Sequence, residues 1–337
     1  MIYPKFIKEN SVVGVPAPSN GAGSIDKQNR ILNAKKRLEN LNYEVILSKN
    51  VMKSDKKRSA NYKVRAKEIN DMFKNNNIDL LMCASGGEFL VEILPYIDFD
   101  IIKNNPKFIT GFSDPTGLLY PITTKLDIAT IYGTNFSSLG SEHLHRSEED
   151  FLKLITGNLV EQTNYDMYEN EYQERITGLE DYNLTDKVYW RTLDNKNVDI
   201  KGRIIGGCFD LISELAGTKY DGINEFNERY KDDGIIWYFD NCEISMEETI
   251  RTLWKLNELD YFKYTKCIIF GRFGKDQTCC DYDTKSCLKD SVISKLNIPI
   301  VYDADISHKG PCLNIINGSI ANIKVKNGKS SISFKLK

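Results

Sequence analysis

The feature that most constrains the fold of this sequence is the alternation, through its first half, of short apolar runs with segments of helical periodicity. The apolar run Val12 to Val15 is followed, after a Pro/Ser/Gly loop, by apolar residues at helical spacing from Ile25 to Leu41. The pattern then repeats, with further apolar runs at Tyr43 to Leu47, Ile78 to Ala84, Phe108 to Phe112 and Ile128 to Tyr132. Strands that alternate with helices predict right-handed crossovers and a mainly parallel sheet covered by helices on both faces.

The second half of the chain has a different character. From about Thr156 to Asp199 the sequence is polar and tyrosine-rich without a clear period, which indicates a connection between domains. Strand candidates then follow at Ile204, Ile235 to Phe239, Cys267 to Phe273 and Ile298 to Tyr302. Two alternating runs near the C-terminus flank Asn327-Gly328, a strong β-hairpin signal. We therefore predict an N-terminal α/β domain over 1–160, a connection over 161–200 and a β-rich C-terminal domain over 201–337.

Charge and hydropathy restrict the class of partner. The 45 basic and 47 acidic residues nearly cancel, so the net charge of −2 favours a small or zwitterionic ligand over nucleic acid or an anionic membrane. No apolar segment approaches the roughly 18 residues of a membrane helix. Met1 to Asn10 carries charges where a signal peptide would need its apolar region. We expect a cytoplasmic protein that binds neither nucleic acid nor membranes.

The cysteines and histidines limit metal chemistry. Eight cysteines are scattered without C-x-x-C spacing, which is typical of reduced thiols in a core. One group is an exception, Cys279, Cys280 and Cys287, but no histidine lies near it in sequence, so we do not expect a metal site there. The three histidines show no helical H-x-x-x-H spacing, which argues against a metal-dependent hydrolase.

A serine follows one of the predicted strands closely. In the segment Phe108 to Thr116 the apolar strand runs into Gly111, Ser113 comes two residues later, and Pro115 sits where the first turn of a helix tolerates a missing N–H. Such a turn would present Ser113 at the carboxyl edge of the sheet, where open α/β sheets bind ligands. The alternative is that Ser113 or Asp114 merely caps the helix.

A pair of glycines follows another predicted strand. Gly86 and Gly87 follow the apolar run Ile78 to Ala84 after a single serine, so their backbone N–H groups can approach a ligand closely. The loop has too few glycines and no lysine for a phosphate loop. It is therefore either a site for developing negative charge or a plain structural turn.

The second half offers an acid and a base. Asp240 ends the apolar strand Ile235 to Phe239 and could orient a histidine, a role for which Glu243 competes. His308 lies in a loop after the strand Ile298 to Tyr302, a usual setting for a catalytic group, although an ordinary surface histidine is the alternative. His143 and His145 lie in a charged stretch that we interpret as a solvated helix end.

The order of four motifs resembles the LD-carboxypeptidase family of serine peptidases. These motifs are GGEFLVEILPYIDFDIIKNNPKFITGFSDPTGL, GGCFDLISELAGTKYD, WYFDNCE with Arg251 following, and HKGP. The family includes peptidoglycan-recycling carboxypeptidases and microcin C immunity peptidases. The resemblance implies a flavodoxin-like or amidotransferase-like N-terminal domain, a β-rich, barrel-like C-terminal domain, and a homodimer.

The resemblance also implies roles for particular residues. Ser113 matches the nucleophile, His308 the base and Asp240 the acid, although the family usually has glutamate there and Glu243 stays as a reserve. The oxyanion hole maps to the backbone N–H groups of Gly86, Gly87 and Asp114.

Such a triad would hydrolyse an amide through an acyl-enzyme, with no metal or organic cofactor. The expected substrate is a murein tetrapeptide or a peptidyl-nucleotide. Trp190 and Arg191 could contact it, Trp190 as an aromatic platform for a nucleobase, unless Trp190 packs against the interdomain loop. The alternative function is a catalytically inactive peptide-binding protein of the same fold.

Overall fold

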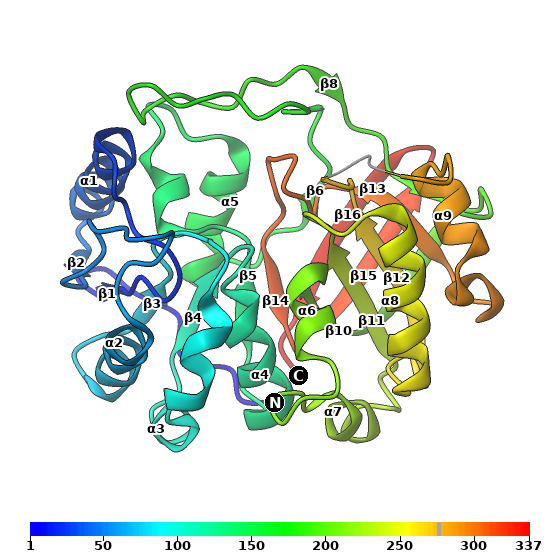
Figure 1. Cartoon of the computed structure of the whole chain (residues 1–337), viewed down its shortest axis with the longest axis horizontal. Helices are drawn as coiled ribbons and strands as arrows, with labels where there is room; N and C mark the ends of the chain where they lie inside the picture. The colour runs from blue at the N-terminus through cyan, green and yellow to red at the C-terminus, as the bar shows by residue number, and fades with distance from the viewer. Residues whose placement is uncertain (275–277) are drawn as a thin grey trace. The chain divides into compact units, whose positions relative to one another are not determined.

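The computed structural model describes residues 1–274 and 278–337, and these divide into two compact units (Figure 1). The first unit consists of Met1–Val160 together with Gln173–Tyr182 and Asn314–Ile316. The second unit consists of Glu161–Tyr172, Asn183–Leu313 and Asn317–Lys337. The chain therefore passes between the two units several times, because the first unit includes two short segments from the second half of the sequence.

A six-stranded sheet forms the centre of the first unit. Its strands are β1 (Val12–Val15), β2 (Glu44–Leu47), β3 (Leu80–Met82), β4 (Phe108–Gly111), β5 (Thr130–Tyr132) and β14 (Ile315–Asn317). The spatial order is β14-β5-β4-β3-β1-β2, and the five N-terminal strands pair in parallel. The order 2-1-3-4-5 is that of flavodoxin-like sheets. The predicted parallel α/β fold is confirmed.

The helices that connect these parallel strands are α1 (Ile25–Asn40), α2 (Tyr62–Lys74), η1 (Leu90–Tyr96), α3 (Phe99–Asn104) and α4 (Thr116–Leu126). After β5 follow η2 (Phe136–Gly140) and α5 (Arg146–Ile155). The predicted apolar stripe of α1 buries Ile31, Ala34 and Leu38. The strands β3 and β4 are buried along their whole length, as expected for a sheet covered on both faces.

The second unit contains a mixed eight-stranded sheet. Its strands are β6 (Gln162–Thr163), β9 (Arg191–Thr192), β10 (Val198–Cys208), β11 (Ile235–Asp240), β12 (Thr265–Gly271), β13 (Ile300–Ala304), β15 (Ile320–Lys326) and β16 (Lys329–Lys335). The order is β6-β16-β15-β10-β11-β12-β13-β9, with β10 to β13 parallel and the outer strands antiparallel. The domain is β-rich as predicted. Within the described residues its sheet is open rather than barrel-like, because β6 and β9 lie at its two edges.

The parallel strands at the centre of this sheet explain why helices lie between them in the sequence. Between β10 and β13 the chain forms α6 (Phe209–Leu215), α7 (Ile223–Arg229), α8 (Met246–Glu258), α9 (Thr284–Asp290) and η3 (Val292–Lys295), because parallel neighbours need crossover connections. The predicted hairpin is confirmed. Asn327 and Gly328 join β15 to β16 with φ of 52° and 78°, as a two-residue primed turn requires.

Residues 161–200, which we expected to connect two domains, contain β6, β9 and a small antiparallel pair, β7 (Met167–Tyr168) and β8 (Asp186–Lys187). Most of this segment is counted in the second unit, since β6 and β9 are edge strands of its sheet. Among the described residues no helix combines the length and apolar character needed to cross a membrane.

Candidate active site

Ser113 occupies a strained turn at the carboxyl end of β4. Its φ is 71°, a left-handed conformation that is uncommon for a residue other than glycine. The strand ends at Gly111, Pro115 takes the N-cap position of α4, and the carbonyl of Ser113 accepts a hydrogen bond from the N–H of Thr116 at 2.9 Å. Strained residues persist only where the surrounding structure fixes them, and they concentrate at functional sites.

The glycine pair lies against this serine. A Cβ atom placed on Gly86 would stand 3.0 Å from Cβ and 3.3 Å from Oγ of Ser113, so only glycine allows this approach. Gly87 has φ of 156°, and a Cβ there would stand 2.2 Å from Oγ of Ser19. Within residues 1–274 and 278–337, the backbone N–H groups of Gly86, Gly87 and Asp114 donate no hydrogen bond.

The carboxylate of Asp114, the residue after Ser113, is buried and holds this turn in place through hydrogen bonds. It is fully buried, and it accepts hydrogen bonds from the hydroxyl of Ser19 and, at 3.0 Å, from the N–H of Leu90. Burial raises the pKa of Asp114 to about 6, against the opposing effect of these hydrogen bonds. Asp114 therefore ties β4 to the loops that follow β1 and β3.

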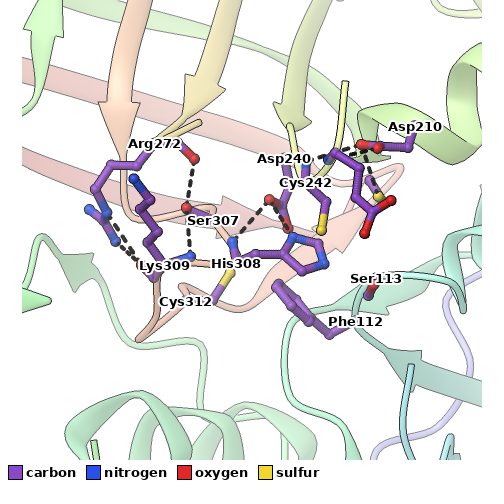
Figure 2. Close-up of polar contacts among 12 residues, drawn as sticks. Phe112, Ser113, Asp210, Asp240, Cys242, Arg272, Ser307, His308, Lys309 and Cys312 are labelled. Atoms are coloured by element: carbon purple, nitrogen blue, oxygen red, sulfur yellow. Dashed lines mark hydrogen bonds and ion pairs between the residues drawn. The ribbon is translucent and has the colours of Figure 1, made fainter. Parts of the chain in front are cut away.

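The second unit places its own polar residues at the carboxyl ends of four parallel strands. Asp240 ends β11, His308 follows β13, Arg272 follows β12, and Asp210 follows β10. Because parallel strands all end at the same edge of a sheet, these side chains gather there (Figure 2).

Asp240 and His308 form a hydrogen-bonded pair at that edge. Oδ1 of Asp240 lies 2.9 Å from Nδ1 of His308 and accepts the backbone N–H of His308 at 3.1 Å (Figure 2). Asp240 is fully buried, whereas the His308 side chain is 20% exposed. Burial lowers the pKa of His308, but the charge and the hydrogen bond of Asp240 outweigh it and leave this pKa well above its usual value. The shorter aspartate side chain therefore reaches the histidine.

The loop after β11 is held by a residue that the sequence did not single out. Asp210 accepts the backbone N–H groups of Cys242 at 3.0 Å and of Glu243 at 2.8 Å (Figure 2). Burial raises the pKa of the Cys242 thiol, and the neighbouring imidazole of His308 opposes this shift. Glu243, the reserve acid, is exposed, and Nδ1 of His308 bonds to Asp240 instead.

A buried ion pair anchors the loop of His308. The guanidinium of Arg272 lies 2.6 Å from Oδ1 of Asp305. It also donates to the carbonyl of Lys309 at 2.8 Å (Figure 2). The hydroxyl of Ser307 donates to the carbonyl of Arg272 at 2.7 Å. His308 is thus flanked on both sides by residues fixed to the end of β12.

Trp190 does not have the exposed position that a nucleobase platform requires. The side chain is 1% exposed, and its Nε1 donates to Oδ2 of Asp305 at 3.0 Å. A buried indole whose N–H is paired is a packing residue, so the expected platform role is corrected. Arg191 differs, because its guanidinium is half exposed and pairs with the Asp303 carboxylate.

Arg191 also lines a cavity of the second unit. The cavity has a volume of about 370 Å³ and includes Lys187, Arg272, Lys309 and Tyr189 in its lining. Lys309 adjoins His308 in the chain, so this cavity begins next to the histidine loop. Four cations line it, against the two carboxylates of Asp186 and Asp303.

The sequence identified the strand-end residues but missed those that hold them. Ser113 with Gly86, and Asp240 with His308, are each brought together within their units. Ser19, Asp210 and Asp305 were missed, since a single carboxylate or hydroxyl far away in sequence carries no recognisable spacing. Only the position of Asp210 in the GGCFD motif was a usable signal.

Comparison with known proteins connects both units to one family. Residues 13–133 match the LD-carboxypeptidase N-terminal domain, and residues 201–323 match the LD-carboxypeptidase C-terminal domain. These two segments contain Ser113, Gly86 and Gly87 in the first case and Asp240 and His308 in the second.

Individual proteins extend the match over almost the whole chain. One relative is a Vibrio cholerae protein that is inferred to be a carboxypeptidase. It is 27% identical over 93% of this chain and 92% of its own length. The microcin C7 self-immunity protein MccF of Escherichia coli is 26% identical over 94% of this chain and 91% of its own. The crystal structure of an MccF-like protein from Bacillus anthracis superposes with a TM-score of 0.85 at 25% identity, covering all of both chains. The chain therefore belongs to the LD-carboxypeptidase family of peptidases.

Proposed function

We propose that this peptidase is a serine hydrolase with Ser113 as nucleophile, His308 as general base and Asp240 as the residue that orients the histidine. The observation that carries the proposal is the hydrogen bond of 2.9 Å between Nδ1 of His308 and the buried carboxylate of Asp240. It fixes the imidazole so that Nε2 is the nitrogen left to accept a proton from a nucleophile.

The roles follow from the chemistry of these groups. His308 takes the hydroxyl proton of Ser113 as Oγ attacks the carbonyl carbon of the substrate amide, and Asp240 stabilises the imidazolium that forms. The imidazolium then donates its proton to the leaving amine, which gives an acyl-enzyme on Ser113. Water, deprotonated by the same histidine, hydrolyses this ester and regenerates the serine.

Stabilisation of the tetrahedral intermediate falls to the backbone around Ser113. The N–H groups of Gly86, Gly87 and Asp114, which make no hydrogen bond within the described residues, are the proposed donors to the oxyanion. Glycine is needed at 86 because any Cβ would press on Ser113.

The substrate is a small peptide-like amide, and the cationic cavity indicates a negatively charged group next to the scissile bond. Lys187, Arg191 and Lys309 line this cavity, and such side chains bind a carboxylate, phosphate or sulfamate. A structure of MccF, 24% identical with a TM-score of 0.83, holds aspartyl sulfamoyl adenosine, an acidic aminoacyl nucleotide analogue. A murein tetrapeptide, with its terminal carboxylate, is the second candidate.

Two experiments test this proposal. A fluorophosphonate probe should label the wild-type chain once, at Ser113, and should leave Ser113→Ala and His308→Ala unlabelled. Mass spectrometry of reactions with a murein tetrapeptide and with aspartyl sulfamoyl adenosine should then show cleavage by the wild type alone. Labelling at another residue would overturn the nucleophile assignment.

A separate variant tests whether the cationic cavity binds the acidic substrate. Lys187→Ala should raise KM about tenfold for the acidic substrate and leave kcat unchanged, because a cation that binds both ground and transition states contributes uniform binding. Binding of either compound without turnover, unchanged in His308→Ala, would favour a catalytically inactive binding protein instead.

A further inference from the structure

A second cluster of chemically reactive side chains lies at the start of α8. It consists of Glu247, in the first turn of that helix, and the adjacent cysteines Cys279 and Cys280. One ligand atom from each residue lies within 4.8 Å of the other two. The sequence had grouped Cys279 and Cys280 with Cys287, but Cys287 is buried and its thiol donates to the carbonyl of Met246 at 3.3 Å. The third member of the cluster is therefore the carboxylate of Glu247 and not the thiol of Cys287.

The spacing of the two thiols suits a shared metal ion. Their Sγ atoms are 3.6 Å apart. Two thiolates bound to one tetrahedral Zn²⁺ at the usual Zn–S distance would be separated by about 3.8 Å. Both cysteines are exposed, so an ion can reach them from solvent without opening the fold.

The third residue fixes the backbone that carries the thiols. Oε1 of Glu247 accepts the N–H of Cys279 at 2.8 Å and of Cys280 at 3.0 Å, as well as the hydroxyl of Thr278. In the described part of the chain, Oε2 of Glu247 accepts no hydrogen bond, so its lone pairs are available to a cation. A preformed position for the ligands lowers the entropy cost of binding.

The electrostatics favour a cation at this place. The ligand atoms of Cys279, Cys280 and Glu247 lie within 4.8 Å of one another, and each group carries a negative charge when it is ionised. The three groups therefore repel one another when all are ionised, and a divalent ion would relieve that repulsion. Softness of the two sulfur ligands favours Zn²⁺ over Mg²⁺ or Ca²⁺.

We propose that Cys279, Cys280 and Glu247 form a binding site for a thiophilic divalent metal ion such as Zn²⁺, with solvent completing the tetrahedron. Each thiol gives up its proton on binding, so the ion is held by two thiolates and one carboxylate. The site is independent of the proposed hydrolytic mechanism, because none of its three residues takes part in the triad.

The test uses the full chain, freed of metal and kept reduced with a phosphine. Titration with Co²⁺ should give one equivalent of binding with a sulfur-to-cobalt charge-transfer band. Competition between the protein and a chromophoric chelator then gives the Zn²⁺ affinity. Cys279→Ser and Cys280→Ser should each weaken Zn²⁺ binding on the order of 100-fold, and Glu247→Gln on the order of tenfold.

A matched control is available on the same helix. Glu258 is exposed in the last turn of α8, and Glu258→Gln should bind Zn²⁺ as the wild type does. Circular dichroism checks that each variant is folded. Absence of the charge-transfer band in the reduced wild type would overturn the proposal. Equal Zn²⁺ affinity in the wild type and in the double variant Cys279→Ser/Cys280→Ser would also overturn it.

Discussion

At the scale of single residues, the proposed chemistry depends on backbone positions that few side chains could occupy. Ser113 has a left-handed φ, and Gly86 lies so close to it that even one added carbon would press on the nucleophile. Residues of this kind concentrate at functional sites, where a strained geometry is maintained by its surroundings. Both positions can be tested with single-atom changes.

Gly86→Ala should lower kcat about 10- to 100-fold while the chain stays folded. The added Cβ would meet Cβ of Ser113 at 3.0 Å, so the serine or the loop must shift away from the oxyanion donors. Gly14→Ala is the control, because its Cβ would meet Ile78 at 3.1 Å, well inside β1. Steady-state kinetics with an ester substrate give the result. Equal losses of activity in both variants would show a general packing defect.

Asp240→Asn should move the acid limb of the kcat/KM profile to lower pH. His308 must be neutral to act as a base, and the negative charge of Asp240 keeps its pKa high. Removing that charge lowers the pKa, although the maximum rate should fall on the order of 10⁴-fold because the imidazole loses its orientation. The profile of log kcat/KM against pH measures the limb. An unshifted limb would mean that another group controls it.

At the scale of secondary-structure elements, two helix N-termini carry polar groups whose effect on stability can be measured. The helix α8 follows Asp240, Cys242 and Glu243, and it begins with a capping box in which Ser245 and Glu248 bond to each other's backbone N–H groups. The helix α5 begins with a buried glutamate at Glu148. Each terminus makes a separate prediction about stability.

Ser245→Ala should destabilise the chain by about 1 kcal/mol, because the N–H of Glu248 loses its partner at the start of α8. Urea unfolding followed by circular dichroism measures the change. In Ser138→Ala, which removes a hydroxyl that makes no hydrogen bond within the described residues, stability should be unchanged. A Ser245 variant as stable as that control would show that the cap contributes nothing.

Glu148→Gln should stabilise the chain at pH 8 by about 2 to 3 kcal/mol more than at pH 5. Burial raises the pKa of Glu148 to about 7, and its Oε2 lacks a hydrogen-bond partner within the described residues. A raised carboxyl pKa means that the folded state keeps its proton while the unfolded state loses it, so stability falls as pH rises from about 4.5 to 7. Glutamine removes this loss.

Urea unfolding at the two pH values measures the difference. Glu149→Gln is the matched control, since Glu149 is exposed in the same turn of α5. The same pH dependence in both glutamine variants would exclude the burial of Glu148 as its cause.

At the scale of the whole molecule, the units are not continuous stretches of chain. The strand β14 pairs with β5 at one end of the first unit's sheet. Asn314, just before it, accepts the hydroxyl of Thr134 at 2.9 Å and donates to the carbonyl of Ser147 at 2.8 Å. The first unit therefore needs residues that the chain supplies about 150 positions later.

Residues 1–160 expressed alone should accordingly be poorly folded, because β5 would be an exposed apolar edge and Thr134 would lose its partner. Fusing residues 312–318 to this fragment through a flexible linker should restore protection of the β5 amides. Hydrogen exchange by mass spectrometry compares the two fragments. Equal protection with and without the added strand would contradict the requirement for β14.

The sequence by itself determined where most strands of the first sheet lie, the C-terminal hairpin and the candidate catalytic residues. Local apolar periodicity specified the strands β1 to β5 and the C-terminal hairpin, because burial on a sheet or helix face imposes a period that a single segment displays. The strand-end positions of Ser113, Asp240 and His308 were also visible, and the family resemblance gave them roles. The expected cytoplasmic location and homodimer stay predictions.

Only the tertiary structure decided which distant groups meet. It buried Trp190 against Asp305, held the loop of Cys242 on Asp210, carried β14 back to the first sheet, and placed Glu247 beside Cys279 and Cys280. The physical reason is that each of these hydrogen bonds and clusters joins groups from segments that are distant in the sequence. A single polar residue in either segment produces no periodic pattern that would reveal its partner. Such pairs exist only after the apolar pattern has folded the chain and removed competing water.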